Sequence, residues 1–176
     1  SGNVIYEIDG MPVLDVLKEY LVGDEIDNWS KAVLSLCMAF KAPEHVKGYD
    51  DYLIRFMPTK DEKAGSITIP TEVEEGTSIW MSRRDHEKIS AGVERIGAEI
   101  KSTLGNNAPK MVFQFDCVGR GKAVFREQQK SQMLEKLQQK IGPTVPWIGL
   151  YTYGEIGPIG AHDYFHNYTA VVLAIY

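Results

Sequence analysis

The chain has 176 residues, of which 44% are hydrophobic and 24% are charged, a composition typical of a packed globular protein. Its net charge of −5 and its scattered lysines and arginines argue against a nucleic-acid-binding protein, which needs clustered positive charge. No apolar run approaches the ~20 residues that cross a bilayer, and no signal-like segment opens the chain, so we expect no membrane insertion.

The first quarter of the chain predicts one strand and two helices. Apolar residues alternate over 3–9, which indicates a strand, whereas apolar residues at helical spacing predict a helix over 12–22. A second apolar stripe predicts a helix over 31–40, with Ser30 as its N-cap and Pro43 at its end.

The middle of the chain predicts short strands followed by a long helix. The stretches 52–58, 65–70 and 76–82 are rich in β-branched or aromatic residues and are bounded by Pro or Gly, which is typical of short strands. Apolar residues then recur every three or four positions over 89–104, and Asp85 is placed to cap this helix.

The C-terminal third predicts a strand over 110–119, a surface helix over 126–142 that Gly142 ends, and strands over 147–154 and 168–176. The last strand is apolar on both faces, which predicts a central position in a covered sheet. Neither strict βαβ alternation nor an all-β series fits this order of elements.

We therefore predict a single α+β domain with a mixed or mainly antiparallel sheet of about six or seven strands covered by helices. The domain spans residues 1–176. Its first two residues, SG, are typical of a scar left by tag cleavage and carry no structural weight.

The stretch FDCVGRGK, residues 115–122, is a strand that runs into a turn with two glycines. It does not fit a Walker phosphate loop, because Asp116 stands where the first glycine is needed and Ala123 where Ser or Thr is needed. Two interpretations stay open: a plain turn with a buried cysteine, or a turn that presents Cys117 and Arg120 to a ligand. Because Cys117 and Cys37 lie in no metal or disulfide pattern, we expect reduced thiols in a cytoplasmic protein.

The stretch AHDYFHN contains His162 and His166 at a spacing that could bind zinc on a helix. It lies between a glycine and a strand, and no third ligand is evident, so we predict no metal site. His166 and Asn167 are expected to hydrogen-bond the backbone in the turn that enters the last strand. A hydrolase that pairs Cys117 with His166 ranks below these interpretations, because no recognisable motif surrounds the cysteine.

The stretch YTYGEIGPIG, residues 151–160, sets Glu155 among three glycines after an apolar strand. A glutamate in such a place often satisfies amide donors of the turn. The glycines also remove side chains from this region, so that a ligand or another backbone segment can approach closely. The residues alone favour the turn and the ligand site about equally.

Three segments together resemble one known family. FDCVGRG followed by a helix, then PWIGLYTYGEIGPIG, and finally FHNYTAVVLAIY are similar to the C-terminal half of the FIST sensory domain. The family pattern joins a C-x-G-R-G strand end, a G-x-x-x-x-G-E-I-G strand and turn, and a closing H-N-x-T strand. The opening VIYEIDGMPVLDVLKEYL and the stretch EEGTSIWMSRRD also resemble the family's entry elements and central strand, so the resemblance covers nearly the whole chain.

This resemblance implies a ligand-sensing module rather than an enzyme, with no catalytic residue. Family members occur with signalling output domains and in a eukaryotic F-box protein. The resemblance implies either a small ligand such as an amino acid or, as in gas-sensing members, haem. It also implies that the family's N-terminal half or an output domain is a partner. For this chain we expect no cofactor, and the haem alternative would make His162 and His166 the first candidate axial ligands.

Our leading hypothesis is a small polar ligand held at two strand ends, the turn from Cys117 to Arg120 and the turn from Tyr153 to Gly157. Arg120 would bind a carboxylate and Glu155 an amine. The predicted ligand-binding residues are Cys117, Arg120, Tyr153, Glu155, His166 and Asn167, with Trp147 and Tyr151 as candidate apolar walls. A protein-interaction domain, as in the F-box context, is the second hypothesis.

Overall fold

The computed structural model describes residues 2–42, 52–121 and 123–176. Within these ranges it contains four α-helices and thirteen strands, which amount to 30% helix and 33% strand. The expected α+β class is therefore confirmed. Pro43, the expected end of the second helix, and Ser1 lie outside the described residues.

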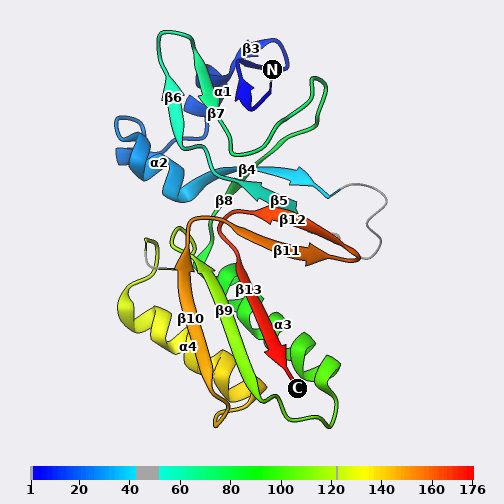
Figure 1. The fold of residues 1–176 in the computed structure, drawn as a ribbon. Coiled ribbons are helices and arrows are strands. Elements are labelled where there is room, and N and C mark those ends of the chain that lie inside the picture. The colour runs from blue at the N-terminus through cyan, green and yellow to red at the C-terminus, as the bar shows by residue number, and fades with distance from the viewer. Residues whose placement is uncertain (1, 43–51, 122) are drawn as a thin grey trace. The chain divides into compact units, whose positions relative to one another are not determined.

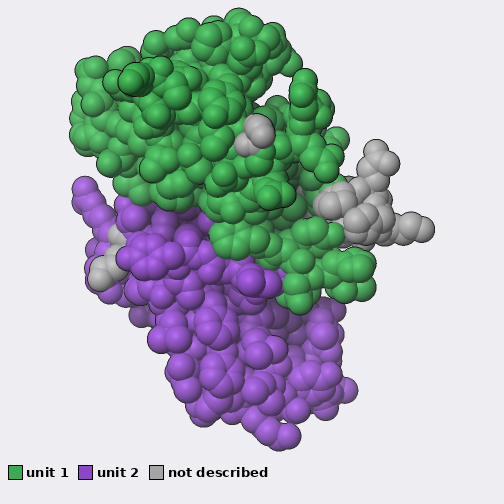
Figure 2. Space-filling view, turned by 45° about the horizontal axis from the view of Figure 1, so that its top comes forward, with its two compact units in different colours: residues 1–84, 158–166 green, residues 85–157, 167–176 purple. Residues whose placement is uncertain are grey.

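The chain divides into two compact units, shown in green and purple in Figure 2. Unit 1 consists of residues 1–84 and 158–166, and unit 2 of residues 85–157 and 167–176. Each unit has its own hydrophobic core. In the described residues the strands form five sheets of two or three strands, rather than one sheet of six or seven (Figure 1).

Unit 1 is built from short strands and two short helices. Its elements are β1 Val4–Ile5, β2 Glu7–Ile8, β3 Met11–Pro12, α1 Val13–Lys18, the 3-10 helix η1 Gly23–Glu25, α2 Trp29–Ser35, β4 Leu36–Lys41, β5 Tyr52–Arg55, β6 Thr59–Asp61, β7 Ser66–Thr68 and β8 Trp80–Arg83. In two antiparallel sheets, β7 lies between β1 and β6, and β4 lies between β5 and β8. Val13 and Leu17 of α1 pack with Met38 of β4 and Ile67 of β7 in the core.

The helix expected over 31–40 is wrong in its second half and in its cap. Helix α2 ends at Ser35, and Leu36–Lys41 form the strand β4. Asn28, not Ser30, caps the helix, because its side chain accepts a hydrogen bond from a backbone N–H in the first turn. The central strand β4 is buried on both faces, and such a strand has the same continuous apolar run as a buried helix.

An ion pair joins η1 to the end of β8 in unit 1. The guanidinium of Arg83 donates to both carboxylate oxygens of Glu25, over 2.8 and 3.1 Å. Glu25 also accepts hydrogen bonds from the Ser35 hydroxyl and from the backbone N–H of Val22. The hydrogen bonds from Arg83 are the main reason why the pKa of Glu25 falls to about 2.

The change Glu25→Gln should lower the free energy of unfolding by about 1–2 kcal/mol at pH 7, because it removes a charge-assisted hydrogen-bonded pair. The folded-state pKa of Glu25 lies below its unfolded value of about 4.3, so the stabilisation is present above that pH and is lost as the pH falls toward 2. Urea unfolding should therefore show a difference between wild type and variant that shrinks below pH 5. Glu74→Gln, at an exposed position, is the control. A Glu25→Gln difference that is unchanged at pH 3 would contradict this account.

Unit 2 is a three-stranded sheet with two helices on one face. Its elements are α3 His86–Leu104, β9 Met111–Cys117, α4 Glu127–Ile141, β10 Trp147–Thr152 and β13 Ala170–Ile175. The central strand β9 pairs in parallel with β10 and antiparallel with β13, so the prediction of mixed pairing is confirmed. Both helices pack on the face of the sheet that carries Val112, Trp147 and Val172 (Figure 1).

Both helices of unit 2 form where the sequence predicts them. The side chain of Asp85 caps α3 by accepting a hydrogen bond from the N–H of Lys88 at 2.8 Å. Helix α4 ends at Gly142, as expected. The predicted central position of the last strand is wrong, because β13 is an edge strand whose Leu173 and Ile175 are exposed.

Two strands form where the sequence predicts turns. These are β11 Glu155–Ile159 and β12 His162–His166, which pair as a hairpin. Gly160 opens the two-residue connection with a φ of +64°. A left-handed first residue is what the tight type II′ hairpin turn requires, and glycine adopts it without strain.

Candidate functional site at the ends of β9 and β10

The two turns predicted to form a site lie side by side in unit 2. The chain leaves β9 at Cys117, passes through a loop into α4, and returns as β10 parallel to β9. Thr152, the last residue of β10, lies opposite Cys117, and its carbonyl accepts a hydrogen bond from the Val118 N–H at 2.8 Å. The carboxyl ends of both strands therefore meet at one edge, where ligands commonly bind in sheets built from such crossovers.

Four polar side chains form a buried group at this edge, beneath α4. The group, called the Asp116 cluster below, comprises Gln114, Asp116, Arg120 and Lys130. One oxygen of Asp116 accepts a hydrogen bond from Arg120 Nη1 at 3.3 Å. The other contacts Lys130 Nζ and accepts a hydrogen bond from Gln114 Nε2 at 3.3 Å. A single buried carboxylate thus holds a cation from the loop and a cation from the helix.

Burial controls the ionisation of the two cations. It lowers the pKa of Lys130 to about 8, because desolvation disfavours the charged ammonium. Burial also lowers the pKa of Arg120, while the charges of Cys117 and Glu155 act in the opposite direction. Arg120 therefore lies within the electrostatic reach of the acidic groups on both sides of the strand end.

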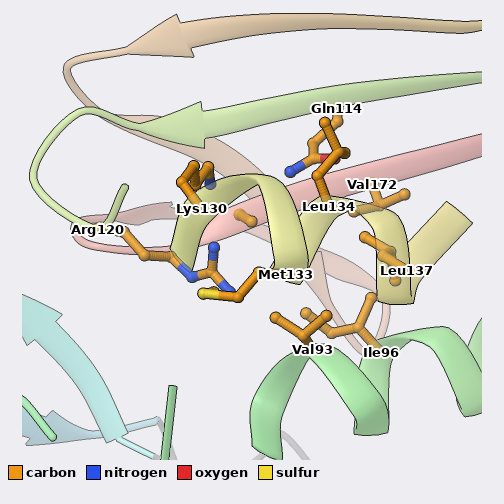
Figure 3. Close-up of a pocket in the computed structure, with 10 residues that line it drawn as sticks. Val93, Ile96, Gln114, Arg120, Lys130, Met133, Leu134, Leu137 and Val172 are labelled. Atoms are coloured by element: carbon orange, nitrogen blue, oxygen red, sulfur yellow. The ribbon is translucent and has the colours of Figure 1, made fainter. Parts of the chain in front are cut away.

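A small cavity adjoins the Asp116 cluster (Figure 3). Gln114, Arg120 and Lys130 line its polar part, while Val93 of α3 and Met133 of α4 are among the apolar residues that close it. Its volume is about 10 Å³, which leaves room for roughly one water molecule. Among the described residues, the Oε1 atom of Gln114 has no hydrogen-bond partner and is buried there. An amino acid does not fit this cavity unless α4 or the loop before it moves.

Glu155 lies at the same strand end and is almost fully buried. One carboxylate oxygen accepts a hydrogen bond from the Thr169 hydroxyl at 3.0 Å, and the other accepts one from the Thr152 hydroxyl. Glu155 therefore ties the end of β10 to the start of β13. The donors are threonine hydroxyls, and not the turn amides that the sequence suggested, while the role of Glu155 toward a ligand stays a prediction.

The two glycines of the VGRG turn are explained by close contacts. A Cβ atom at Gly119 would lie 2.5 Å from the ring of Tyr168, so an alanine there would displace the ring. A Cβ atom at Gly121 would lie 3.1 Å from the ring of Tyr151 and from Lys130 Nζ. The glycines thus allow the turn to pack against an aromatic ring on each side.

The other predicted site residues have different surroundings. Cys117 is buried, and its carbonyl accepts the backbone N–H of both Arg120 and Gly121 at 2.9 Å. Tyr153 is 91% exposed, whereas Asn167 is buried. His166 is the last residue of unit 1, so it belongs to a different unit from the rest. Unit 2 thus brings together Cys117, Arg120 and Glu155.

Sequence reasoning missed four residues that complete this region: Gln114, Lys130, Thr152 and Thr169. The clearest available signal was in β9, where Gln114 and Asp116 alternate with Phe113 and Phe115. A polar face on an otherwise apolar strand indicates polar partners when that face is buried. Lys130, in the first turn of the helix that follows, is the candidate cation to pair with these polar side chains.

None of the helices in the described part of the chain is both long enough and apolar enough to span a bilayer. Across residues 2–42, 52–121 and 123–176, no three His, Cys, Asp or Glu side chains gather in a way that would hold a metal ion.

The family model of the FIST C domain matches residues 14–158, which is most of the chain. The chain therefore belongs to the FIST C domain family, as the resemblance indicated. The match ends before Asn167 and Thr169, so the tie from Glu155 to Thr169 reaches beyond the matched region. This family is associated with sensing in signal-transduction proteins.

Curated relatives have longer chains. The chain is 30% identical over 176 aligned positions to an uncharacterized protein of Mycobacterium tuberculosis, and 29% identical to an uncharacterized protein of Mycobacterium bovis. Each alignment covers 97% of this chain and 44% of the relative, so the chain spans less than half the length of these relatives. No solved structure matches the chain.

The Asp116 cluster predicts two different costs for removing a charge. Asp116→Asn removes the counter-charge that the buried Arg120 and Lys130 share, and should lower the free energy of unfolding by about 3–5 kcal/mol. Lys130→Met keeps the volume and leaves Asp116 paired with Arg120, so its effect should be about 1 kcal/mol or less in either direction. Urea unfolding at pH 7 measures both. Equal costs for the two variants would contradict the central role of Asp116.

The two cysteines should react at different rates. Burial raises the pKa of Cys37 to about 11, and its thiol donates a hydrogen bond to the Ser82 carbonyl, so it should stay unmodified in the folded protein. Cys117 is also buried, but it is the last residue of β9, so local opening of the loop that follows would expose its thiol. Brief maleimide treatment at neutral pH, read by mass spectrometry, should label Cys117 first, with Cys117→Ala as the assignment control. Equal or inverted labelling would refute this prediction.

Proposed function

We propose that the chain is the small-ligand-binding sensory module of an intracellular signal-transduction protein. The observation that carries the proposal is the meeting of the C-x-G-R-G turn and the G-E-I-G turn at the carboxyl ends of two parallel strands. This is the position at which open sheets with crossover helices bind ligands. The ligand would lie over the turns that follow Cys117 and Thr152.

The charges at this edge favour a small zwitterion such as an amino acid. Arg120 would bind the ligand carboxylate, since its contact with Asp116 uses Nη1, and the guanidinium carries five N–H donors. Glu155 would bind the ligand amine in exchange for a threonine hydroxyl. The exposed ring of Tyr153 would cover an apolar part of the ligand.

The burial of Arg120 and Glu155 supports a sensing mechanism. A ligand that reaches these groups must displace the loop between β9 and α4 or the turn after β10, because both side chains are nearly inaccessible in the folded unit. Ligand binding would therefore be coupled to movement of these segments, and the ligand's interaction with the moved state would supply the free energy. The moved segments would carry the signal to an output domain or to the rest of a longer polypeptide.

The proposal assigns binding, and not catalysis, to Cys117 and its neighbours. Cys117 is buried, which keeps its thiol away from a substrate in solution. A haem does not fit the cavity beside the Asp116 cluster, whose volume is about 10 Å³. We therefore derive no role for a cofactor from this region.

A protein-interaction role is the second candidate, and one observation favours it. At the turn between β10 and β11, Tyr153 is 91% exposed and Ile156 is 73% exposed. Two large apolar side chains exposed within four residues are typical of a protein contact, because aromatic residues are enriched there. This role would make the same turn a recruiting surface.

The experiment is a thermal-shift screen of amino acids and small metabolites, followed by calorimetric titration of any ligand found. Glu155→Gln should weaken binding by on the order of 2–5 kcal/mol, which is more than tenfold in affinity. Arg120→Lys should also weaken binding of a carboxylate, since an ammonium cannot reproduce the planar guanidinium contacts. Melting curves without ligand show whether each variant is folded.

Glu94→Gln is the matched control, because Glu94 is an exposed carboxylate on α3 that pairs with Lys140. It should bind the ligand as wild type does. A ligand that binds wild type, Glu155→Gln and Arg120→Lys equally well would show that the site lies elsewhere. A screen without any ligand would favour the protein-interaction role.

A further inference from the structure

The sheet of unit 2 has a second apolar face, opposite α3 and α4. Side chains alternate along each strand, so the residues between those that contact the helices point to this face. We call it the outer face, and it consists of Met111, Phe113, Phe115, Ile148, Leu150, Val171, Leu173 and Ile175.

Strand register places these side chains in rows across the sheet. Phe113 of the central strand lies between Ile148 of β10 and Leu173 of β13. The next row toward the carboxyl ends places Phe115 between Leu150 and Val171. Neighbouring side chains on one face of a sheet are close enough to pack together. The outer face is therefore a continuous apolar surface without a charged residue.

This surface is left open to solvent. Ile148, Leu150, Leu173 and Ile175 leave 44–59% of their surface exposed. A sheet with one solvated face ordinarily carries polar residues there, whereas apolar residues on both faces are typical of sheets covered on both sides. The outer face thus has the apolar composition of a buried sheet face, although solvent reaches it.

We propose that the outer face binds the outer face of a second copy of the chain, which makes a two-fold symmetric dimer. In such a contact each patch meets its own copy, and an uncharged patch brings no like charges together. Sheets pack face to face about 10 Å apart with strands turned by about 30°. Rows of Phe, Leu and Ile at strand spacing are suited to that packing.

The area is sufficient for this interface. Four aliphatic residues about half exposed, with their partly exposed neighbours, amount to on the order of 500 Å² of apolar surface, near the upper limit for a monomer. Two copies would bury about 1,000 Å², the lower bound for a specific interface. The dimer should therefore be reversible and concentration-dependent. The inference is independent of the proposed ligand site.

The test is sedimentation velocity of the purified chain over a range of concentrations. Wild type should form a dimer, and the double variant Leu150→Lys with Leu173→Lys should raise the dimer dissociation constant by more than roughly 100-fold, because each copy loses two buried apolar side chains. The matched control places two lysines on the exposed side of α4, as Gln132→Lys with Gln139→Lys, and should dimerise as wild type does.

Circular dichroism and melting curves check the fold of each variant. Leu150→Thr with Leu173→Thr, a milder change that introduces β-branched side chains favourable in strands, replaces the lysine variant if that variant does not fold. A wild-type chain that stays monomeric at about 100 μM would overturn the proposal, and would assign the outer face to additional polypeptide such as the longer relatives carry. A dimer that persists in both outer-face variants would also overturn it, because the contact would then lie elsewhere.

Discussion

The carboxylate of Asp116 is the point at which strand, loop and helix are joined in unit 2. It contacts Arg120 in the loop after β9 and Lys130 in the first turn of α4, while it lies on β9 itself. Each of these charges loses most of its hydration, and Asp116 supplies the compensating charge for both cations. The path of the loop, and with it the approach of Tyr151 and Tyr168 to the turn glycines, therefore depends on one carboxylate.

Acidic side chains lie on both faces of the sheet at this strand end, and both interact electrostatically with the guanidinium of Arg120. Asp116 lies on the face covered by the helices, whereas Glu155 is tied to Thr152, whose side chain points to the other face. Burial lowers the pKa of Arg120 and the charge of Glu155 opposes this shift, while Asp116 accepts a hydrogen bond from the same guanidinium. A change at either acid therefore alters the surroundings of Arg120. In a region of low dielectric such coupling is strong, and it links the two sides of a single sheet layer.

Local signals were sufficient for much of unit 2 but not for its site. Helix α3 with its Asp85 cap, the strand β9 and the end of α4 at Gly142 depend on periodicity and end residues that lie within one segment. The position of β13 at a sheet edge depends on long-range pairing, which periodicity does not contain. The same holds for the cluster: Arg120 and Glu155 stood out by their turns, whereas Lys130 and Thr169 become partners only through the crossover and the pairing of β13. In unit 1, the sequence predicts a helix where β4 forms, because a short buried apolar run fits both the helical and the strand period.

The contact between Gly119 and Tyr168 also has an evolutionary consequence. Tyr168 has a φ of +56°, an uncommon conformation for a residue with a side chain, and its ring fills the space that a Cβ at position 119 would need. A side chain at position 119 is therefore tolerated only where position 168 carries a smaller residue or where its ring lies elsewhere. Across related chains, positions 119 and 168 should vary as a pair, although they lie 49 positions apart in sequence. The residue pair at positions 119 and 168 would then identify a related chain that forms the same turn, even where its overall sequence identity to this chain is low.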